Sequence, residues 1–182
     1  MKLLSYWLSA FSFALHNEVF AKWLIAKGAD VDARQQLGQP ALTYAIAHGD
    51  IAIVHLLLAE GADVTWGNLL HSAVEREDQI EAAEIIEVLV RKGADVNAIR
   101  HDNRIALPFK TFSLLPTPLY LACEKENIPA ARALLKHGAD PKKKVLCQGS
   151  PGSNCLERVK TICNPQLLNL VLGSVSNTVS NI

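Results

Sequence analysis

The sequence lacks the features that would assign it to several large functional classes. Lysine and arginine number 18, and aspartate and glutamate also number 18, so there is no basic excess to favour nucleic acid. No apolar run reaches the roughly 20 residues of a membrane-spanning helix, because Glu18 and Lys22 interrupt the most hydrophobic stretch. We therefore predict a chain that binds neither nucleic acid nor a membrane.

Motifs of catalysis and of cofactor binding are also missing. The sequence has no G-x-x-x-x-G-K-[ST], G-x-G-x-x-G, G-x-S-x-G or H-E-x-x-H. His48 and His55 fall on different expected helices, and no third residue at a fitting spacing completes a metal site. We predict no cofactor, no metal and no enzymatic activity.

The four cysteines do not form a metal or redox motif. Cys147, Cys155 and Cys163 are spaced eight residues apart, unlike the C-x-x-C of zinc and redox sites. Cys123 lies in an apolar helical stripe and is expected to pack as a small hydrophobe. A Cys147–Cys155 disulfide would require an exported protein, and it stays open as an alternative.

The first fourteen residues have the form of a signal peptide. Lys2 precedes an apolar run, and Ala14 could be the cleavage residue. Cleavage there would delete half of a sequence repeat whose other half follows at once. We therefore expect residues 1–14 to be retained in a cytoplasmic protein, with export as the alternative.

What the sequence does contain is a repeat. Gly-Ala-Asp begins at Gly28, Gly61, Gly93 and Gly138, at intervals of 33, 32 and 45 residues. Each interval holds a short apolar segment, a polar break and a second apolar segment. A glycine after a helix can adopt the left-handed conformation that ends it, and the aspartate can turn the chain by bonding its own backbone. The repeat predicts consecutive helix pairs, and 49% hydrophobic residues suffice for a buried core.

The expected helix starts are marked by capping residues. Asn17, Asp50 and Asn127 each stand eleven residues before their glycine and are predicted to cap the second helix of a pair. In the segment TPLYLA, Thr117 would cap a first helix, with Pro118 at its first position.

The period, the Gly-Ala-Asp turn and TPLYLA together resemble the ankyrin-repeat family over roughly residues 7–140. The copies at 40–45 and 68–73 are looser and lack the capping threonine. The resemblance implies an all-α solenoid of stacked helix pairs joined by β-hairpin fingers, each pair burying its apolar face on its neighbours. It also implies a structural hydrogen bond for His71, at the family's histidine position.

We predict a single domain over residues 1–172, followed by a flexible polar tail at 173–182. The repeats are expected at about 7–38, 39–66, 67–98 and 99–140, and a C-terminal helix pair is expected to cap the stack at 153–172. Ser153 or Asn154 would start the first helix of the cap, and Asn164-Pro165 the second.

One departure from the repeat concerns the third helix pair. Asp78 precedes Gly93 by 15 residues instead of eleven, which predicts an extra turn in the second helix. Asp78 and Glu81 predict a capping box at its start. Glu81, Glu84 and Glu87 form a stripe that we interpret as a solvated outward face.

The other departure concerns the fingers, measured from the turn aspartate to the fourth residue of the next first-helix motif. The intervals are 13 residues from Asp30 to Thr43, 8 from Asp63 to His71 and 25 from Asp95 to Tyr120. The short finger carries Trp66 near its tip. The long one is an insertion predicted to form an extended hairpin that turns near Asp102-Asn103. Long ordered loops usually have a function, and its arginine and aromatic residues are typical of binding hot spots. In the alternative reading, the apolar residues within 109–115 only shield the gap beside the short finger.

We predict a protein-interaction module that binds an unidentified protein through a concave surface formed by the fingers and by the turn after each first helix. The candidate residues are Arg34, Gln36, His48, Trp66, Glu75, Arg76, Arg100, His101, Arg104, Phe109, Phe112, Glu124 and Lys125. A self-associating scaffold is the second hypothesis, with a homodimer formed through the apolar N-terminal helix. An enzyme or small-molecule binder with the long finger as a lid is the third.

Overall fold

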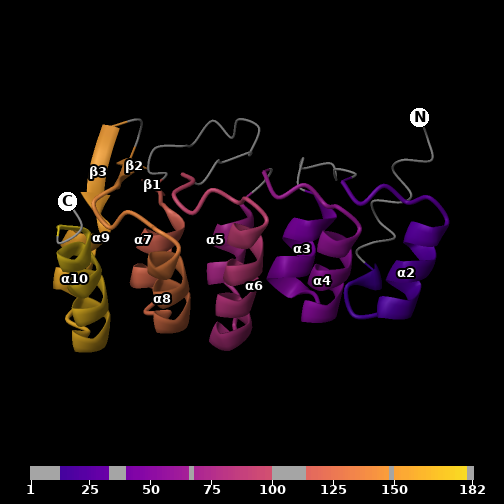
Figure 1. Cartoon of the computed structure of the whole chain (residues 1–182), viewed down its shortest axis with the longest axis horizontal. Helices are drawn as coiled ribbons and strands as arrows, with labels where there is room; N and C mark the ends of the chain where they lie inside the picture. The colour runs from indigo at the N-terminus through magenta and orange to yellow at the C-terminus, as the bar shows by residue number, and fades with distance from the viewer. Residues whose placement is uncertain (1–12, 33–39, 66–67, 100–113, 148–149, 180–182) are drawn as a thin grey trace.

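The described part of the chain is a row of helices, with a small three-stranded sheet near the C-terminal end of the row. The computed structural model describes residues 13–32, 40–65, 68–99, 114–147 and 150–179. Figure 1 shows the helices standing side by side in chain order, from α2 to α10. The architecture is the all-α solenoid that the family resemblance implied.

Helices follow one another in antiparallel pairs after α2 (Glu18–Ala26). The pairs are α3 (Ala41–His48) with α4 (Ile51–Ala59), α5 (Leu69–Val74) with α6 (Gln79–Arg91), α7 (Pro118–Glu124) with α8 (Ile128–Lys136), and α9 (Cys155–Ile162) with α10 (Pro165–Val179). Within a pair the chain descends in the first helix and returns in the second. The turn inside each pair therefore lies at one end of the helices, and the fingers lie at the other (Figure 1).

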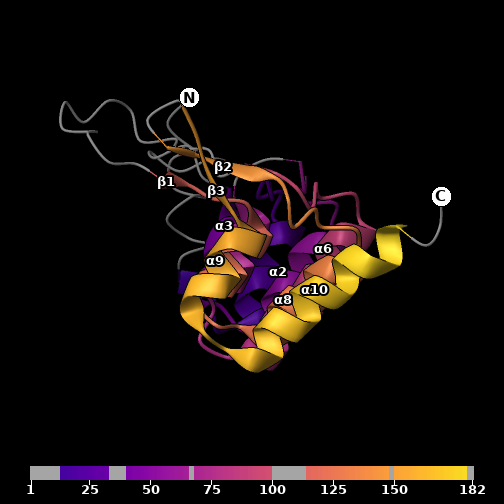
Figure 2. The same ribbon diagram turned by 90° about the vertical axis from the view of Figure 1, so that its left-hand side faces the viewer.

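The strands belong to the last two fingers. β1 (Leu114–Leu115), β2 (Lys144–Cys147) and β3 (Ser150–Asn154) form an antiparallel sheet in that order. Leu115 is opposite Leu146, and the register shifts between Lys144 and Leu146 in the β2–β3 pair. Figure 2, which looks along the row, shows the three strands together at the finger end. The end of the long finger thus pairs with the finger that follows it.

The four Gly-Ala-Asp turns have the predicted geometry. The glycines have φ angles of 86°, 88°, 101° and 86°. A Cβ atom on any of them would meet nothing within 4 Å, so the left-handed backbone, rather than lack of space, accounts for glycine there. Each aspartate accepts a hydrogen bond from the backbone N–H two residues later, at 2.8–2.9 Å. The repeat is thus a helix stop followed by an aspartate turn.

Most of the predicted caps are confirmed. Thr117 Oγ1 accepts from the Tyr120 N–H at 3.2 Å, and Asn17 and Asn127 also accept from backbone N–H groups of their helices. Asn154 forms a complete capping box with Glu157 at the start of α9.

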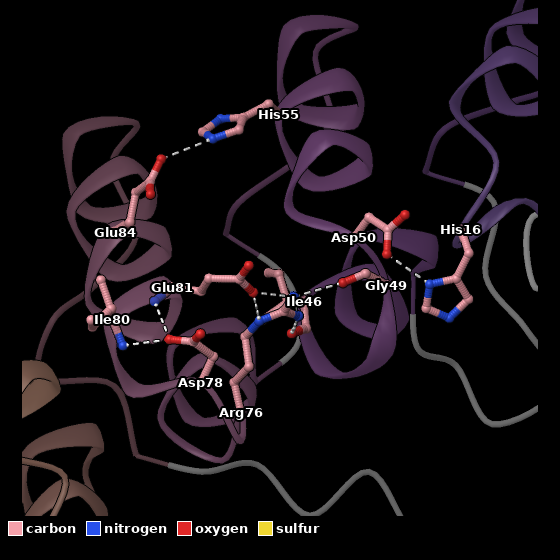
Figure 3. Close-up of polar contacts among 10 residues, drawn as sticks. All are labelled: His16, Ile46, Gly49, Asp50, His55, Arg76, Asp78, Ile80, Glu81 and Glu84. Atoms are coloured by element: carbon pink, nitrogen blue, oxygen red, sulfur yellow. Dashed lines mark hydrogen bonds and ion pairs between the residues drawn. The ribbon is translucent and has the colours of Figure 1, made fainter.

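Asp50 is the exception among the predicted caps. It occupies the N-cap position of α4, but its side chain makes no capping hydrogen bond. Its Oδ1 instead lies 2.8 Å from His16 Nδ1 in the preceding turn (Figure 3). The Asp50 carboxylate therefore joins two repeats instead of capping its own helix.

The core is a continuous apolar layer between the helices. It includes Leu42 and Ile46 of α3, Leu57 of α4, Leu89 of α6 and Leu134 of α8, all fully buried. Burying one such side chain stabilises the fold by about 1.5–3 kcal/mol. Each helix pair buries its apolar faces against the neighbouring pairs, so the stability of one pair depends on the pairs beside it.

Helix α6 has the predicted extra turn, with 13 residues where α4 and α8 have nine. Asp78 caps it by accepting from the N–H groups of Ile80 and Glu81. The predicted capping box is only half formed, because the Glu81 carboxylate accepts from Arg76 instead of reaching back to Asp78.

The α6 glutamates are exposed or half-exposed, as interpreted, but each of them also pairs with a basic residue. Glu81 pairs with Arg76, Glu84 lies 3.3 Å from His55 of α4, and Glu87 pairs with α8. Residues three apart are offset by only about 60° around a helix, so Glu84 and Glu87 lie on one outward face, from which Glu84 reaches α4 and Glu87 reaches α8. These glutamates bridge the third helix pair to both adjacent pairs.

Glu87 has three basic neighbours. Its oxygens lie 2.7 Å from Lys136 Nζ, 3.1 Å from His137 Nε2 and 3.8 Å from Arg91. Hydrogen bonds from Lys136 and His137 hold the pKa of this carboxyl below its ordinary value. A lowered folded-state pKa means stability that is present above the unfolded pKa and is lost as the pH falls.

We accordingly expect Glu87→Gln to flatten the loss of stability between about pH 5 and pH 3. The measurement is urea unfolding of wild type and variant at several pH values in that window. Glu84→Gln is the matched control, because Glu84 meets only His55 across a half-exposed contact. Parallel pH curves for wild type and Glu87→Gln would contradict the assignment.

The expected packing of Cys123 is confirmed, and the alternative disulfide is not formed. Cys123 is fully buried, as expected, and a hydrogen bond with Cys155 together with burial raises its pKa. It therefore stays a protonated, packed thiol. Cys155 is a buried free thiol, so the alternative Cys147–Cys155 disulfide is not present. Cys155 opens α9, where it packs against the last repeat.

The C-terminal helix is longer than predicted. Residues 165–172 are helical as expected, but α10 continues to Val179 into the segment expected to be a flexible tail. Gly173 does not end the helix, and the Ser174 hydroxyl donates to the Val171 carbonyl within it. Half-buried Ser174 and Val175 extend the packed face begun by Leu167 and Val171.

Candidate functional site

The predicted site residues divide into two groups. Eight of them lie outside the described residues: Arg34, Gln36, Trp66, Arg100, His101, Arg104, Phe109 and Phe112. The predicted turn of the long finger near Asp102-Asn103 also lies outside them. The other five, His48, Glu75, Arg76, Glu124 and Lys125, lie at the turns inside the helix pairs. These turns are at the opposite end of the helices from the strands (Figure 1), so they do not share a surface with the fingers as predicted.

We call the row of turns at residues 15–17, 48–50, 75–78, 124–127 and 163–164 the turn edge. Its acidic residues are Asp50, Glu75, Glu77, Asp78, Glu124 and Glu126. The second helices begin here, where the helix dipole favours carboxylates. Their opposite ends carry cations, as at Lys27, Lys92 and Lys136. A chain of zero net charge thus has one acidic edge.

The turn groove is a hollow of about 430 Å³ in this edge, between the second and third helix pairs. It is lined by Ala47, His48, Glu75, Arg76, Glu77, Asp78 and Glu81. Its volume falls within the roughly 300–1,000 Å³ of known ligand sites, but it is open to solvent. An open groove of this size suits side chains of a partner better than an enclosed small molecule.

Arg76 forms the floor of the turn groove and is a structural residue. Its guanidinium donates to the carbonyls of Ile46 at 2.9 Å and Gly49 at 2.8 Å, and to Glu81 at 2.8 Å (Figure 3). Its side chain is 11% exposed. These bonds satisfy carbonyls at the end of α3 that have no partner within the helix. Arg76 therefore clamps two repeats together, which makes it unavailable to a partner.

The other predicted turn residues are exposed. His48 lies at the end of α3, beside the turn groove, and makes no hydrogen bond or ion pair with any residue that the structure describes. Glu124 lies 3.3 Å from Arg158 of α9, which ties the last repeat to the cap. Lys125 follows it in the same turn. Glu75 also lines the turn groove, but Glu124 and Lys125 do not.

A second cleft lies at the finger end. We call it the finger cleft; its volume is about 160 Å³ and it is lined by Val64, Thr65, Leu69, Leu70, His71, Gly93, Ala94, Asp95 and Ala98. None of these lining residues was predicted as a binding residue. His71 has the structural role implied for it: it is 1% exposed, and its Nε2 lies 2.9 Å from the Pro116 carbonyl oxygen.

The finger cleft coincides with a change in how neighbouring fingers are linked. Asp32 Oδ1 accepts from the Asp63 N–H at 2.8 Å, and Asn97 Oδ1 accepts from the Asp140 N–H at 2.8 Å. Thr65 occupies the equivalent position between them, two residues after its turn aspartate. Its hydroxyl donates to its own Asp63 at 2.7 Å instead. The fingers on either side of the cleft are therefore linked differently from their neighbours.

The described residues contain no candidate metal site and no candidate membrane-spanning helix. No three histidine, cysteine, aspartate or glutamate side chains in the described ranges are grouped so that they could hold a metal ion. Among the helices whose placement is described, none combines the length and the hydrophobicity needed to cross a bilayer.

Comparison with known proteins agrees with the geometry. A family model described as "Ankyrin repeats (3 copies)" matches residues 9–100, and one described as "Ankyrin repeat" matches residues 117–144. The chain belongs to the ankyrin-repeat family. Ankyrin repeats generally mediate protein–protein interaction and are typically not enzymes.

Curated relatives share the repeats but are much longer. The chain is 29% identical over 132 residues to the ankyrin repeat and KH domain-containing protein mask-1 of Caenorhabditis elegans, covering 72% of this chain and 4% of that protein. It is 35% identical over 118 residues to a bovine mitochondrial disaggregase, covering 65% and 16%, respectively. With the ankyrin repeat protein nuc-2 of Neurospora crassa the identity is 33% over 121 residues, which cover 65% of this chain and 10% of that protein.

Proposed function

We propose that this chain is a non-enzymatic module that binds a protein partner on its finger side, at the finger cleft and the fingers around it. The observation that carries the proposal is the finger cleft itself. It lies where a first helix, α5, meets two fingers of unequal length, and apolar side chains such as Val64 and Leu69 line it beside the carboxylate of Asp95. An apolar hollow with a few polar groups at its rim is typical of a binding site, and at about 160 Å³ this one is sized for a side chain of a partner and not for a whole small-molecule ligand.

The long finger supports the same location. Its first described residues, up to Ile99, and its last, from Leu114, both lie near the finger cleft. Ala98 lines the cleft, and the Pro116 carbonyl oxygen accepts a hydrogen bond from His71 of the lining. The hot-spot residues predicted for this finger remain part of the proposal. A partner that enters the finger cleft would meet the described ends of the finger at the same time.

The proposal is tested by filling the finger cleft without disturbing the core. Thr65→Arg with Ala98→Arg adds bulk at two positions that are not fully buried. Asn169→Arg, on an exposed position of α10, is the matched control. We expect affinity capture from a native lysate to recover a partner with wild type and with the control but not with the double variant. Recovery of the same partners by all three folded proteins would refute the finger cleft as the site.

Self-association is a second candidate because the first repeat exposes apolar side chains. Phe13 is 79% exposed, Val19 80% and Trp23 51%. Trp23 also stacks on Phe20, with ring centroids 5.9 Å apart. Exposed apolar patches of this kind often mark interfaces between proteins. A homodimer formed through this face would cover them.

Analytical ultracentrifugation over a range of concentrations tests the second candidate. A dimer formed through the first repeat should dissociate on Val19→Glu, whereas Ile80→Glu, on an equally exposed isoleucine of α6, should leave it intact. A mass that equals the monomer at every concentration would rule out this dimer.

We also propose that residues 1–14 are retained and that the protein acts in the cytoplasm. Ala14 is fully buried in the core, and the adjacent Leu15 carbonyl accepts from the Asp50 N–H at 2.9 Å. Removal of this segment would take a core residue from the first repeat. Intact mass of the protein purified from its own cells tests the proposal, and a mass that lacks residues 1–14 would contradict it.

A further inference from the structure

The turn groove is separate from the finger cleft and carries its own charge. Four carboxylates line it, from Glu75, Glu77, Asp78 and Glu81, against one guanidinium from Arg76. Its four carboxylates and one guanidinium give the lining a net charge of −3, leaving His48 out of the count. Arg76 cannot move to neutralise the others, because two backbone carbonyls of the preceding repeat hold it in place.

The carboxylates of the turn groove have different tasks. Asp78 Oδ1 caps α6, and Glu81 Oε2 accepts from Arg76. Glu77 is exposed, and within the described residues no hydrogen bond or ion pair engages it. The groove thus contains a carboxylate that can accept from a cation without giving up a structural bond.

An exposed apolar side chain stands beside this charge. Ile80 lies in the first turn of α6, between the groove residues Asp78 and Glu81, and is 77% exposed (Figure 3). The extra turn of α6 positions it there, since α4 and α8 are about one turn shorter. Isoleucine at so exposed a position contributes little to the fold and is available to a partner.

We propose that the turn groove is a docking site for a basic protein segment, with an arginine or lysine side chain beside Glu77 and an apolar neighbour over Ile80. Charge complementarity selects this occupant: the groove is negative, the remaining turn edge is acidic on both sides, and arginine binds carboxylates through paired hydrogen bonds. The apolar contact at Ile80 adds affinity that does not depend on salt. The site is distinct from the finger cleft, so one chain can hold two partner segments.

The test uses a fluorescein-labelled synthetic peptide, GRLKGRLKG, titrated with the full chain and followed by fluorescence anisotropy. Wild type should bind it, and the acidic peptide GELEGELEG should not bind. Glu75→Gln with Glu77→Gln should weaken binding about fivefold, the size expected for two exposed ion pairs. Ile80→Asn should weaken it to a similar extent and leave the fold unchanged, which keeps the test valid if the double variant does not fold.

The control removes the same charge elsewhere. Glu18→Gln with Glu60→Gln takes two carboxylates from exposed positions outside the turn edge and should change affinity by less than about twofold. Equal weakening by the two double variants, or no binding of the basic peptide to wild type, would overturn the proposal. So would calcium binding that Glu77→Gln abolishes, or a self-association that the peptide reverses, because these would assign the groove to a cation or to a second copy of the chain.

Discussion

Replacing Arg76 with leucine is expected to lower the free energy of unfolding by about 2–3 kcal/mol, since it removes three hydrogen bonds made by a charged group. The carbonyls of Ile46 and Gly49 would lose their partner at the end of α3, and the Glu81 carboxylate would lose its cation. Water can reach Glu81, which is 36% exposed, so the loss should stay below that of a fully buried charge. Urea unfolding followed by circular dichroism measures the difference.

Arg91→Leu is the matched control for Arg76. Arg91 is also an arginine paired with a glutamate, but its side chain is 67% exposed and its contact with Glu87 is 3.8 Å. We expect this change to cost less than about 1 kcal/mol. Equal losses for the two variants would mean that Arg76 acts only as a surface charge and not as a clamp between repeats.

The largest effect on the fold is expected from Leu134→Ala, which should cost about 3–4 kcal/mol. Leu134 is fully buried in α8, so its truncation would leave a cavity in the core. Since small domains are stable by only about 5–15 kcal/mol, the variant should be partly unfolded under mild denaturant. Leu172→Ala, at a leucine that is 42% exposed in α10, should cost less than about 1.5 kcal/mol.

The destabilisation caused by Leu134→Ala should extend to the neighbouring repeats. In a repeat protein each unit is stabilised by its neighbours, so a cavity in one interface weakens adjacent units more than distant ones. Hydrogen exchange of Leu134→Ala should therefore speed up in α6 and α10 more than in α3. Uniform acceleration over all helices would instead indicate a single cooperative unit, and acceleration confined to α8 would contradict coupling between repeats.

The repeat units could be predicted from the sequence because their signals are local. A left-handed glycine, an aspartate turn and a capping threonine or asparagine each act over two to five residues, as at Gly28, Asp30 and Thr117. The extra turn of α6 was also readable, since it changes the spacing between two such signals.

The contacts between repeats could not be predicted in the same way. Asp50 looks like any helix cap, and only the stacked structure shows that its carboxylate meets His16. Arg76 binds backbone carbonyls at positions 46 and 49, and carbonyls carry no sequence signal. The ion pairs of the α6 glutamates were not predicted, because a helical stripe does not show which neighbour lies beside it. The turn groove combines these contacts, so only three of its lining residues, His48, Glu75 and Arg76, were among the predicted site residues.

The grouping of fingers and turns in one surface failed for a geometric reason. Sequence order places the turn residue Arg76 close to the short finger, whereas the helices separate the two ends in space (Figure 1). The separation divides the predicted site residues between two faces. It also leaves room for two functions, one at the finger cleft and one at the turn groove.

Protein binding at the finger cleft is the central claim, and hydrogen exchange of the chain with a captured partner tests it most directly. The account predicts slower exchange at residues 64–65, 69–71 and 94–98 in the complex, with α2 unchanged. Protection confined to α2, with no change around the finger cleft, would contradict it and would place the partner on the apolar face of the first repeat.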